Sequence, residues 1–349
     1  METGTLERLA ADVQHNCHIA DARHAGDYTL CVYLLKMREF YRWEHGHGFA
    51  EELPGEAVGQ WLREREALWE TLEEAEYQPL VLDGEQLDPF DSEAINARLL
   101  PQGLVYSGGL GCKCRPHFFL GELLHEERAE EYHLLVSGRE LARDLAAPPA
   151  MSLDGTIFVR RESLRRMLWE RTEEARWSPG ETPMKRAIAG YGFERNVEAA
   201  LERMTDDMTG QLVQHEIGEI RAGRLLGRAW RELVASLPRS RAEILLRAIR
   251  DHLADALATL PDLIERGLPA AEVHFYMANL NGMRRQLFPS LVEAYGQWLE
   301  QGDAKPFRAA LAPAAEHWQA AAQTALEAWC QGGSEGLRAV QDELAARSL

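Results

Sequence analysis

Cysteine is scarce in this chain, with five residues among 349. A small, odd number of cysteines argues against a disulfide framework and favours a reducing compartment. Long apolar runs are missing too, since no stretch approaches the roughly 20 apolar residues that span a bilayer. The opening residues METGTLERLAADVQ contain acidic side chains and no apolar run, so we expect no signal peptide. These absences predict a cytoplasmic protein without a membrane segment.

Positive charge is in deficit, with 38 Lys and Arg against 56 Asp and Glu. Residues 1–150 hold 13 basic and 28 acidic residues, a net of -15, which leaves 25 and 28, a net of -3, for the remainder. An acidic surface repels phosphate backbones, so we expect no nucleic-acid binding. A basic protein or a small molecule is compatible with this charge as a partner. The oligomeric state stays open.

The composition is otherwise that of a globular helical protein, with 46% hydrophobic and 27% charged residues. The length predicts two domains. Proline-bearing breaks at 146–155 and 178–183 favour three segments. These are a mixed, mostly helical N-terminal domain over 1–150, a linker or edge strand plus helix over 151–180, and a C-terminal helical bundle over 181–349.

Hydrophobic periodicity gives a coarse set of elements. In the first domain we expect helices over 4–44, 55–76, 92–100 and 116–133, with a weak point in the first helix at Gly26. An Asp-Gly turn signal predicts a hairpin within 77–91. Strands are expected to begin at 104, at 133 and at 156, with 133–138 pairing with 104–108. From there on we expect five helices, at 192–235, 239–266, 269–300, 304–331 and 333–347. The predicted fold is mainly α: an N-terminal α+β domain with a small antiparallel sheet, then an up-and-down helical bundle.

The clearest functional pattern is a polar stripe on the first predicted helix. If residues 15–44 form one helix, then Cys17, Asp21, His24, Tyr28 and Cys31 lie within about 80° of one another. Such side chains are unusual on a solvent-facing helix, and buried polar groups need partners. Two interpretations stay open: a hydrogen-bonded contact between helices, or a functional pocket. In the second, His18, Asp21 and His24 are candidate metal ligands, and Tyr28 is a candidate catalytic group.

A second pattern lies in the long helix predicted over 192–235. His215 and Glu219 are one helical turn apart, so both can reach the same ion. The spacing is similar to that of the zinc-binding motif H-E-x-x-H, with Glu in place of the second His. Glu216 would then be a catalytic group. The alternative is an exposed face of His and Glu residues.

The glycine-rich segment GGLGCKCRPH (108–117) offers Cys112, Cys114 and His117 as thiol and imidazole ligands. Its glycines, together with Arg115, could instead bind an anion. A tight turn with a buried cysteine is the structural alternative. Arg285 is a further candidate for anion binding, for which a salt bridge is an equal explanation.

Two segments, 16–44 and 111–119, resemble segments of an uncharacterised bacterial protein family of unknown function. The resemblance covers mainly residues 15–118. It implies no activity, so no residue role follows from it.

Taken together, the patterns favour a metal-dependent cytoplasmic enzyme whose reaction is open. His18, Asp21 and His24 would combine with His215 and Glu219 around iron, manganese or zinc. The alternative is a non-enzymatic interaction or regulatory protein with an acidic docking surface. A small-molecule pocket without a metal is the third hypothesis.

Overall fold

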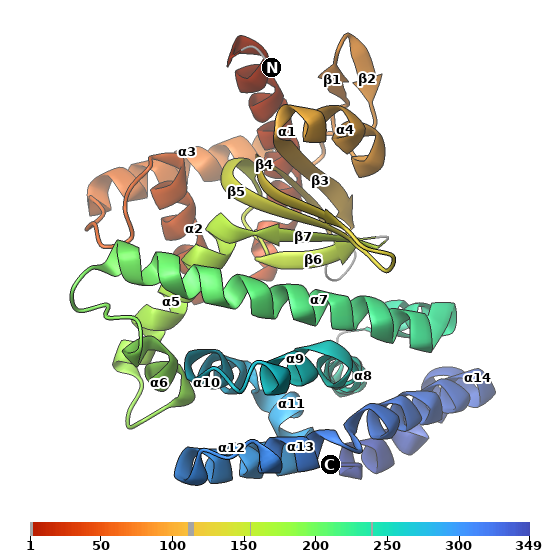
Figure 1. The fold of residues 1–349 in the computed structure, drawn as a ribbon. Helices are drawn as coiled ribbons and strands as arrows, with labels where there is room; N and C mark the ends of the chain where they lie inside the picture. The colour runs from red at the N-terminus through yellow and green to blue at the C-terminus, as the bar shows by residue number, and fades with distance from the viewer. Residues whose placement is uncertain (1–2, 111–114, 154, 239) are drawn as a thin grey trace. The chain divides into compact units, whose positions relative to one another are not determined.

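The computed structural model describes residues 3–110, 115–153, 155–238 and 240–349 (Figure 1). The chain divides into two compact units. The first unit comprises residues 1–170 and 194–205, and the second comprises 171–193 and 206–349. All described strands lie between residues 80 and 160, and the second unit is built from helices, which confirms the mainly helical fold with an N-terminal sheet. No described helix is both long and apolar enough to cross a membrane.

The opening helix is interrupted. Helix α1 spans Thr3–His24, a 3₁₀ turn covers Ala25–Asp27, and α2 (Leu30–Glu44) begins after two extended residues. The prediction of a single helix over 4–44 is therefore wrong. The break includes Gly26, where helix propensity is lowest. Because Tyr28 and Cys31 lie beyond the break, they do not continue the line of side chains that α1 presents. Helices α3 (Gly55–Leu72) and α4 (Ser92–Leu99) follow near their expected positions.

The first unit contains a two-stranded hairpin and a five-stranded sheet (Figure 1). The hairpin, β1 (Leu80–Leu82) and β2 (Glu85–Leu87), is confirmed, with Asp83 and Gly84 at positive φ in its two-residue turn. The larger sheet has the order β3-β4-β5-β7-β6. Its strands are Leu104–Leu110, Pro116–Arg128, His133–Arg143, Ala150–Leu153 and Thr156–Arg160, numbered β3 to β7.

Three expectations about this sheet are wrong. The helix predicted over 116–133 is strand β4, because its apolar residues alternate between two buried faces once it pairs on both sides. Since β4 lies between β3 and β5, residues 133–138 do not pair with 104–108. The sheet is also not purely antiparallel, because β5 and β7 are parallel.

The alternation of side chains places α1 on one face of the sheet. Tyr106, Phe118 and Leu120 share a buried cluster with Val13 and Cys17 of α1. Their odd-numbered neighbours point the other way, into a second buried cluster that contains Val105, Phe119, Leu135 and Phe158. Successive residues of β3 and β4 are thus buried on both sides, and this fixes their register.

The parallel pairing of β5 and β7 positions the start of helix α5 (Arg161–Trp177). Ser137 of β5 is the register partner of Arg160, the last residue of β7. The chain then turns directly into α5, while β5 continues to Arg143. The first turn of α5 therefore lies beside the end of β5, as shown by the hydrogen bond from Glu140 N to the carboxyl group of Glu162.

The second unit has more helices than the five that were expected. Its elements are α6 (Pro183–Ala189), α7 (Val197–Ser236, of which residues 206 onward belong here), α8 (Arg241–Ala254), a π-helical turn (Asp255–Thr259), α9 (Leu260–Glu265), α10 (Ala270–Asn279), α11 (Gly282–Leu287), α12 (Pro289–Gln301), α13 (Lys305–Leu311) and α14 (Ala314–Ala346). The segment expected as one helix over 269–300 breaks twice, at 280–281 and before Pro289. The Gly332-Gly333 pair kinks α14 rather than ending it.

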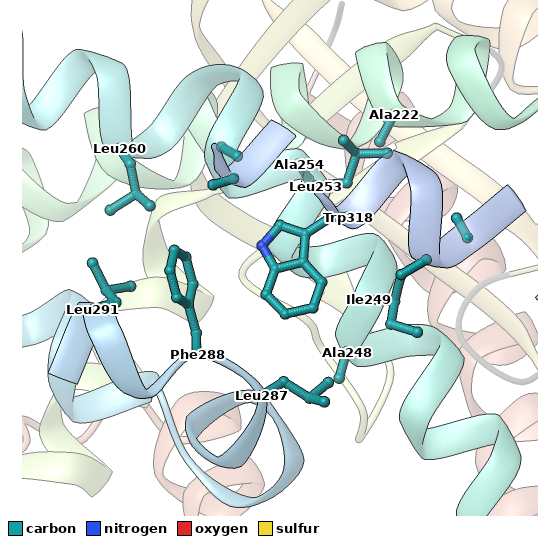
Figure 2. Close-up of a cluster of buried hydrophobic side chains, with 14 of the residues drawn as sticks. Ala222, Ala248, Ile249, Leu253, Ala254, Leu260, Leu287, Phe288, Leu291 and Trp318 are labelled. Carbon is teal, nitrogen blue, oxygen red and sulfur yellow. The ribbon is translucent and has the colours of Figure 1, made fainter. Parts of the chain in front are cut away.

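The core of the second unit gathers around Trp318 (Figure 2). Its indole ring packs edge-on against Phe288, with ring centroids 5.7 Å apart, and stacks on His252 at 4.8 Å. Ile249 and Leu253 of α8 are in the same buried cluster. This packing joins α8, α11, α12 and α14 into one core.

Close packing at Gly218 of α7 is a first test of this fold. A Cβ atom at Gly218 would lie 2.3 Å from the carbonyl oxygen of Ala254, so the two helices must separate to admit it. We expect Gly218→Ala to lower the free energy of unfolding by about 1–3 kcal/mol, measured by urea denaturation. Gly223→Ala, on the same helix with open space at Cβ, is the control and should be neutral or slightly stabilising. Equal effects of the two substitutions would contradict this packing.

Candidate functional site

The first unit contains a cavity of about 520 Å³. It is lined by the end of α2, the loop 46–49, the end of β5, the first turns of α5 and residues 198–205 of α7. Cavities of roughly 300–1,000 Å³ are typical of small-molecule sites. The cavity is the natural place to look for function in this unit.

The charge of the cavity wall is opposite to that of the surrounding sequence. Six arginines and four glutamates line it, although acidic residues outnumber basic ones by 28 to 13 within residues 1–150. The arginines are Arg42, Arg139, Arg143, Arg161, Arg165 and Arg166, and the glutamates are Glu39, Glu162, Glu198 and Glu202. Basic side chains are thus concentrated where a ligand could reach them.

Four of these arginines are neutralised by carboxylates of the protein. Arg42 Nε contacts Glu39 at 3.2 Å, and Arg139 contacts Glu122 at 2.9 Å. On the opposite wall Arg161 pairs with Glu202 at 2.8 Å, and Arg165 pairs with Glu198 at 2.5 Å and with Glu202 at 3.2 Å. Arg143 and Arg166 have only longer contacts with carboxylates, 3.8 Å to Glu140 and 3.6 Å to Glu170.

Arg143 is 2% exposed and lies at the end of β5. The side chain of Gln14 holds its backbone through two hydrogen bonds of 3.0 Å. Its guanidinium carbon lies 5.4 Å from the ring centres of both Phe40 and Trp43. The single hydrogen bond of this guanidinium to the described residues runs from Nε to Asp144 O at 3.4 Å. Its two terminal nitrogens therefore remain free to bind a ligand.

Arg166 is 7% exposed and lies on the second turn of α5. Nη2 donates to Ala147 O at 3.0 Å, and Nε lies 3.6 Å from Glu170. Nη1 is buried and has no hydrogen-bond partner among the described residues. Burial and the positive charge of Arg166 together lower the pKa of Arg143 to about 9, so Arg143 stays charged at neutral pH. Two like charges are therefore held together in one cavity.

A buried ion pair between Arg160 and Glu140 lies next to Arg143. Arg160 Nε donates to Glu140 Oε1 at 2.8 Å, and both side chains are fully buried. Ser163 donates to the same carboxylate oxygen at 2.7 Å. Arg143 Nε lies 3.8 Å from the other oxygen of Glu140, so the shorter ion pair of this carboxylate is the one with Arg160.

In the first unit, the residues of the predicted polar stripe have partners of their own. His18 is buried, with Nε2 2.6 Å from Arg65 Nη1 and Nδ1 accepting from Trp69 at 3.3 Å. Burial and Arg65 lower the pKa of His18 to about 3. Asp21 accepts hydrogen bonds from Leu145 N at 2.9 and 3.0 Å, and burial raises its pKa.

The other stripe residues are spread over different environments. His24 is partly exposed and lies 3.8 Å from Asp27. Cys17 is buried and donates to Phe118 O at 3.2 Å, whereas Cys31 is exposed. Tyr28 is half-buried beneath Lys36, whose Nζ lies 5.2 Å from its ring centre. The break after α1 thus separates residues that one continuous helix would have aligned.

Of the glycine-rich segment, Cys112 and Cys114 lie outside the described residues. Arg115 forms an ion pair with Asp27. His117 is buried on β4, with Nε2 3.0 Å from Ser107 Oγ. Burial lowers the pKa of His117, which favours its neutral form.

The candidates of the second unit belong to a buried ionic cluster. His215 Nδ1 lies 2.9 Å from Asp255 Oδ1, and Asp255 also accepts from Tyr276 at 2.8 Å. Glu219 pairs with Arg250 at 2.6 Å. Glu216 is buried, at 9% exposure. Arg285 is exposed and lines a separate cavity of about 210 Å³ in this unit.

No group of three or more His, Cys, Asp or Glu side chains among the described residues is arranged to hold a metal ion. His18, Asp21 and His24 belong to the first unit, and His215 and Glu219 to the second. The strongest donors, His18, Asp21 and His215, are engaged by protein groups as described above.

The sequence analysis missed Arg143, Arg166 and Glu162. The sequence does contain a hint of this site. Two pairs of adjacent arginines occur at 160–161 and 165–166, the first at the end of a predicted strand and the second just after it. Amphipathic helices commonly carry such charges on a solvated face, so the pattern alone did not single them out.

Two family models match the chain. Residues 8–160 match the N-terminal domain of a family of unknown function, DUF6866, and residues 165–347 match its C-terminal domain. The chain belongs to the DUF6866 family. The resemblance to an uncharacterised family is thus confirmed. Comparisons with curated proteins and with solved structures gave no match. The function of this DUF6866 protein therefore has to be argued from its own residues.

The ionic cluster of the second unit predicts a pH dependence of stability. The hydrogen bond to Asp255 and the charge of Asp255 outweigh the effect of burial and raise the pKa of His215 to about 9. Because the folded pKa exceeds the ordinary value of 6.5, the stabilisation is complete below pH 6.5 and is lost as pH rises through 9. With 29% of this side chain exposed, we expect a loss of about 1–2 kcal/mol between pH 6.5 and 10, measured by urea denaturation.

His215→Gln should flatten this dependence. His125→Gln, at an exposed position on β4, is the control and should leave the dependence unchanged. An unfolding free energy of the His215→Gln variant that falls with pH as steeply as the wild type would contradict the assignment to His215.

Proposed function

We propose that the first unit of this DUF6866 protein binds a small organic anion, a phosphate or a carboxylate, in the arginine-lined cavity. The observation that carries the proposal is the burial of Arg143 and Arg166 in one cavity, where Nη1 of Arg166 and both terminal nitrogens of Arg143 have no hydrogen-bond partner among the described residues. Removing a charge from water costs several kcal/mol unless a partner compensates for it. An anionic ligand would supply that partner.

The chemistry of guanidinium supports an oxyanion as the ligand. Its planar array of N–H donors matches the oxygens of carboxylate and phosphate groups in a bidentate arrangement. The N-terminal turn of α5 also contributes to the wall through Arg161 and Glu162, and a helix N-terminus favours negative charge. Both features act on the same part of the ligand.

The rest of the cavity suits an organic group. Trp43 and Phe49 line it and offer apolar surface near the charged residues. A volume of about 520 Å³ exceeds what an inorganic ion fills, so the ligand has room for a carbon skeleton. We infer that the oxyanion contacts Arg143 and Arg166 while the skeleton packs against the aromatic rings.

The hypotheses from the sequence stay predictions beside this proposal. A metal-dependent enzyme would require donors that are now bonded to protein groups to become ligands, as for His18 and Asp21. An acidic docking surface for a basic partner rests on the net charge of residues 1–150. Neither accounts for the terminal nitrogens of Arg143 and Arg166 that have no hydrogen-bond partner among the described residues, which is why the anion-binding function is preferred.

The test is a titration with phosphate, sulfate, citrate and adenosine monophosphate, followed by thermal shift and calorimetry. We expect saturable binding of at least one of these anions, with a raised Tm. Arg143→Met and Arg166→Met should each weaken binding about 10- to 100-fold, because each removes a charge-assisted contact of roughly 1.5–3 kcal/mol. Without an anion these variants should be as stable as the wild type or more stable, because a buried charge with only a long carboxylate contact is lost.

Arg139→Met is the matched control. Arg139 lines the same cavity but is largely exposed and pairs with Glu122, so its loss should change the affinity less than threefold. Absence of binding for all four anions, or unchanged affinity in both Arg143→Met and Arg166→Met, would overturn the proposal.

A further inference from the structure

We propose that Glu162 takes up a proton when an anion binds to Arg143 and Arg166, so that the cavity binds the anion and the proton together. This inference rests on the proposed function and adds to it a regulation by pH. It is carried by the position of one carboxyl group among the charges of the cavity.

Glu162 is the one glutamate of the cavity wall that forms no ion pair with the described residues. It lies on the first turn of α5, one turn before Arg166. One carboxylate oxygen, Oε2, accepts a hydrogen bond from Glu140 N. The other oxygen, Oε1, bonds no described residue. A protonated Oε1 could therefore donate to an anion in the cavity.

The charges that act on Glu162 come from β5 and α5. Burial and the negative charge of Glu140 favour a proton on Glu162 and raise its pKa, whereas the hydrogen bond from Glu140 N and the charges of Arg143 and Arg166 oppose this. Glu140 is itself bound to Arg160 of β7. Arg143 and Arg166 are thus the main positive charges that favour the ionised form of Glu162.

The remaining charged groups of the wall are paired and change little when a ligand enters. Arg42 is paired with Glu39, and Arg139 with Glu122. Arg161 and Arg165 are paired with Glu198 and Glu202 of α7. His47 also lines the cavity and lies 2.9 Å from Glu51.

An anion that binds Arg143 and Arg166 cancels the two charges that favour ionised Glu162. It also places its own negative charge near the carboxylate. Both effects raise the affinity of Glu162 for a proton. Because linkage is reciprocal, the anion must then bind more tightly as the pH falls. If one proton is taken up for each anion bound, the affinity changes by up to tenfold for each pH unit.

The experiment is calorimetry of the full chain with sulfate, which keeps its two charges across this range. Binding is measured at pH 6.5 in three buffers of different ionisation enthalpy. The slope of the binding enthalpy against the ionisation enthalpy gives the protons taken up per sulfate. We expect between about 0.3 and 1 for the wild type, and an affinity that weakens about two- to tenfold from pH 6 to pH 7.

Two variants identify the group. Glu162→Gln should bind sulfate at least as tightly as the wild type, with a slope near zero and an affinity independent of pH. His47→Gln should keep the proton uptake of the wild type. Uptake that survives in Glu162→Gln but disappears in His47→Gln would overturn the inference.

The wild-type slope tests the inference even if Glu162→Gln fails to fold. Saturable sulfate binding with no proton uptake would overturn the role of Glu162 and leave the anion-binding function intact. Absence of sulfate binding at every pH, together with failure of the other three anions, would overturn both.

Discussion

Two guanidinium groups, those of Arg143 and Arg166, are buried in one cavity of the first unit and repel each other there. Burying a charge without a partner is among the most costly arrangements in a folded protein. The structure offsets the cost only partly, through the rings of Phe40 and Trp43 and hydrogen bonds to two backbone carbonyls. The nearest carboxylates, of Glu140 and Glu170, lie at 3.8 and 3.6 Å, longer than a hydrogen bond. Binding of an anion would compensate the rest of this desolvation cost.

The fold provides the arrangement through one unusual strand pair. In an all-antiparallel sheet the strand after β5 would return beside it, and the helix that follows would start at the far end. The parallel pair of β5 and β7 instead brings the first turns of α5 beside the end of β5. Arg143 and Arg166 meet because of that topology, and the Arg160–Glu140 pair fixes the junction.

Much of the fold could be predicted from the sequence. The Asp83-Gly84 hairpin and the helical second unit follow from turn chemistry and periodicity. The helix expected over 116–133 could not be corrected locally, because the residues of β4 become strand only through pairing with β3 and β5. Gly26 predicted a weak point in the first helix, but not that the α-helix stops completely over residues 25–29.

The candidate site was harder to predict for a similar reason. Of the stripe, Cys17 and Asp21 are buried, and so is the neighbouring His18. Their partners, such as Arg65 and the backbone of Leu145, come from distant segments and leave these residues engaged in hydrogen bonds. Arg143 and Arg166 look ordinary in the sequence. What makes them notable is that in space they are buried and have only long contacts with carboxylates, at 3.8 and 3.6 Å.

The central claim is that the buried guanidinium groups of Arg143 and Arg166, whose contacts with carboxylates are long, form an oxyanion site. The most direct measurement is a crystal structure of the chain soaked in selenate, with data collected at the selenium absorption edge. The account predicts an anomalous peak in the cavity, with selenate oxygens at hydrogen-bond distance from both side chains. It would be contradicted if the cavity held no peak at saturating selenate and both guanidinium groups were instead paired with carboxylates of the protein.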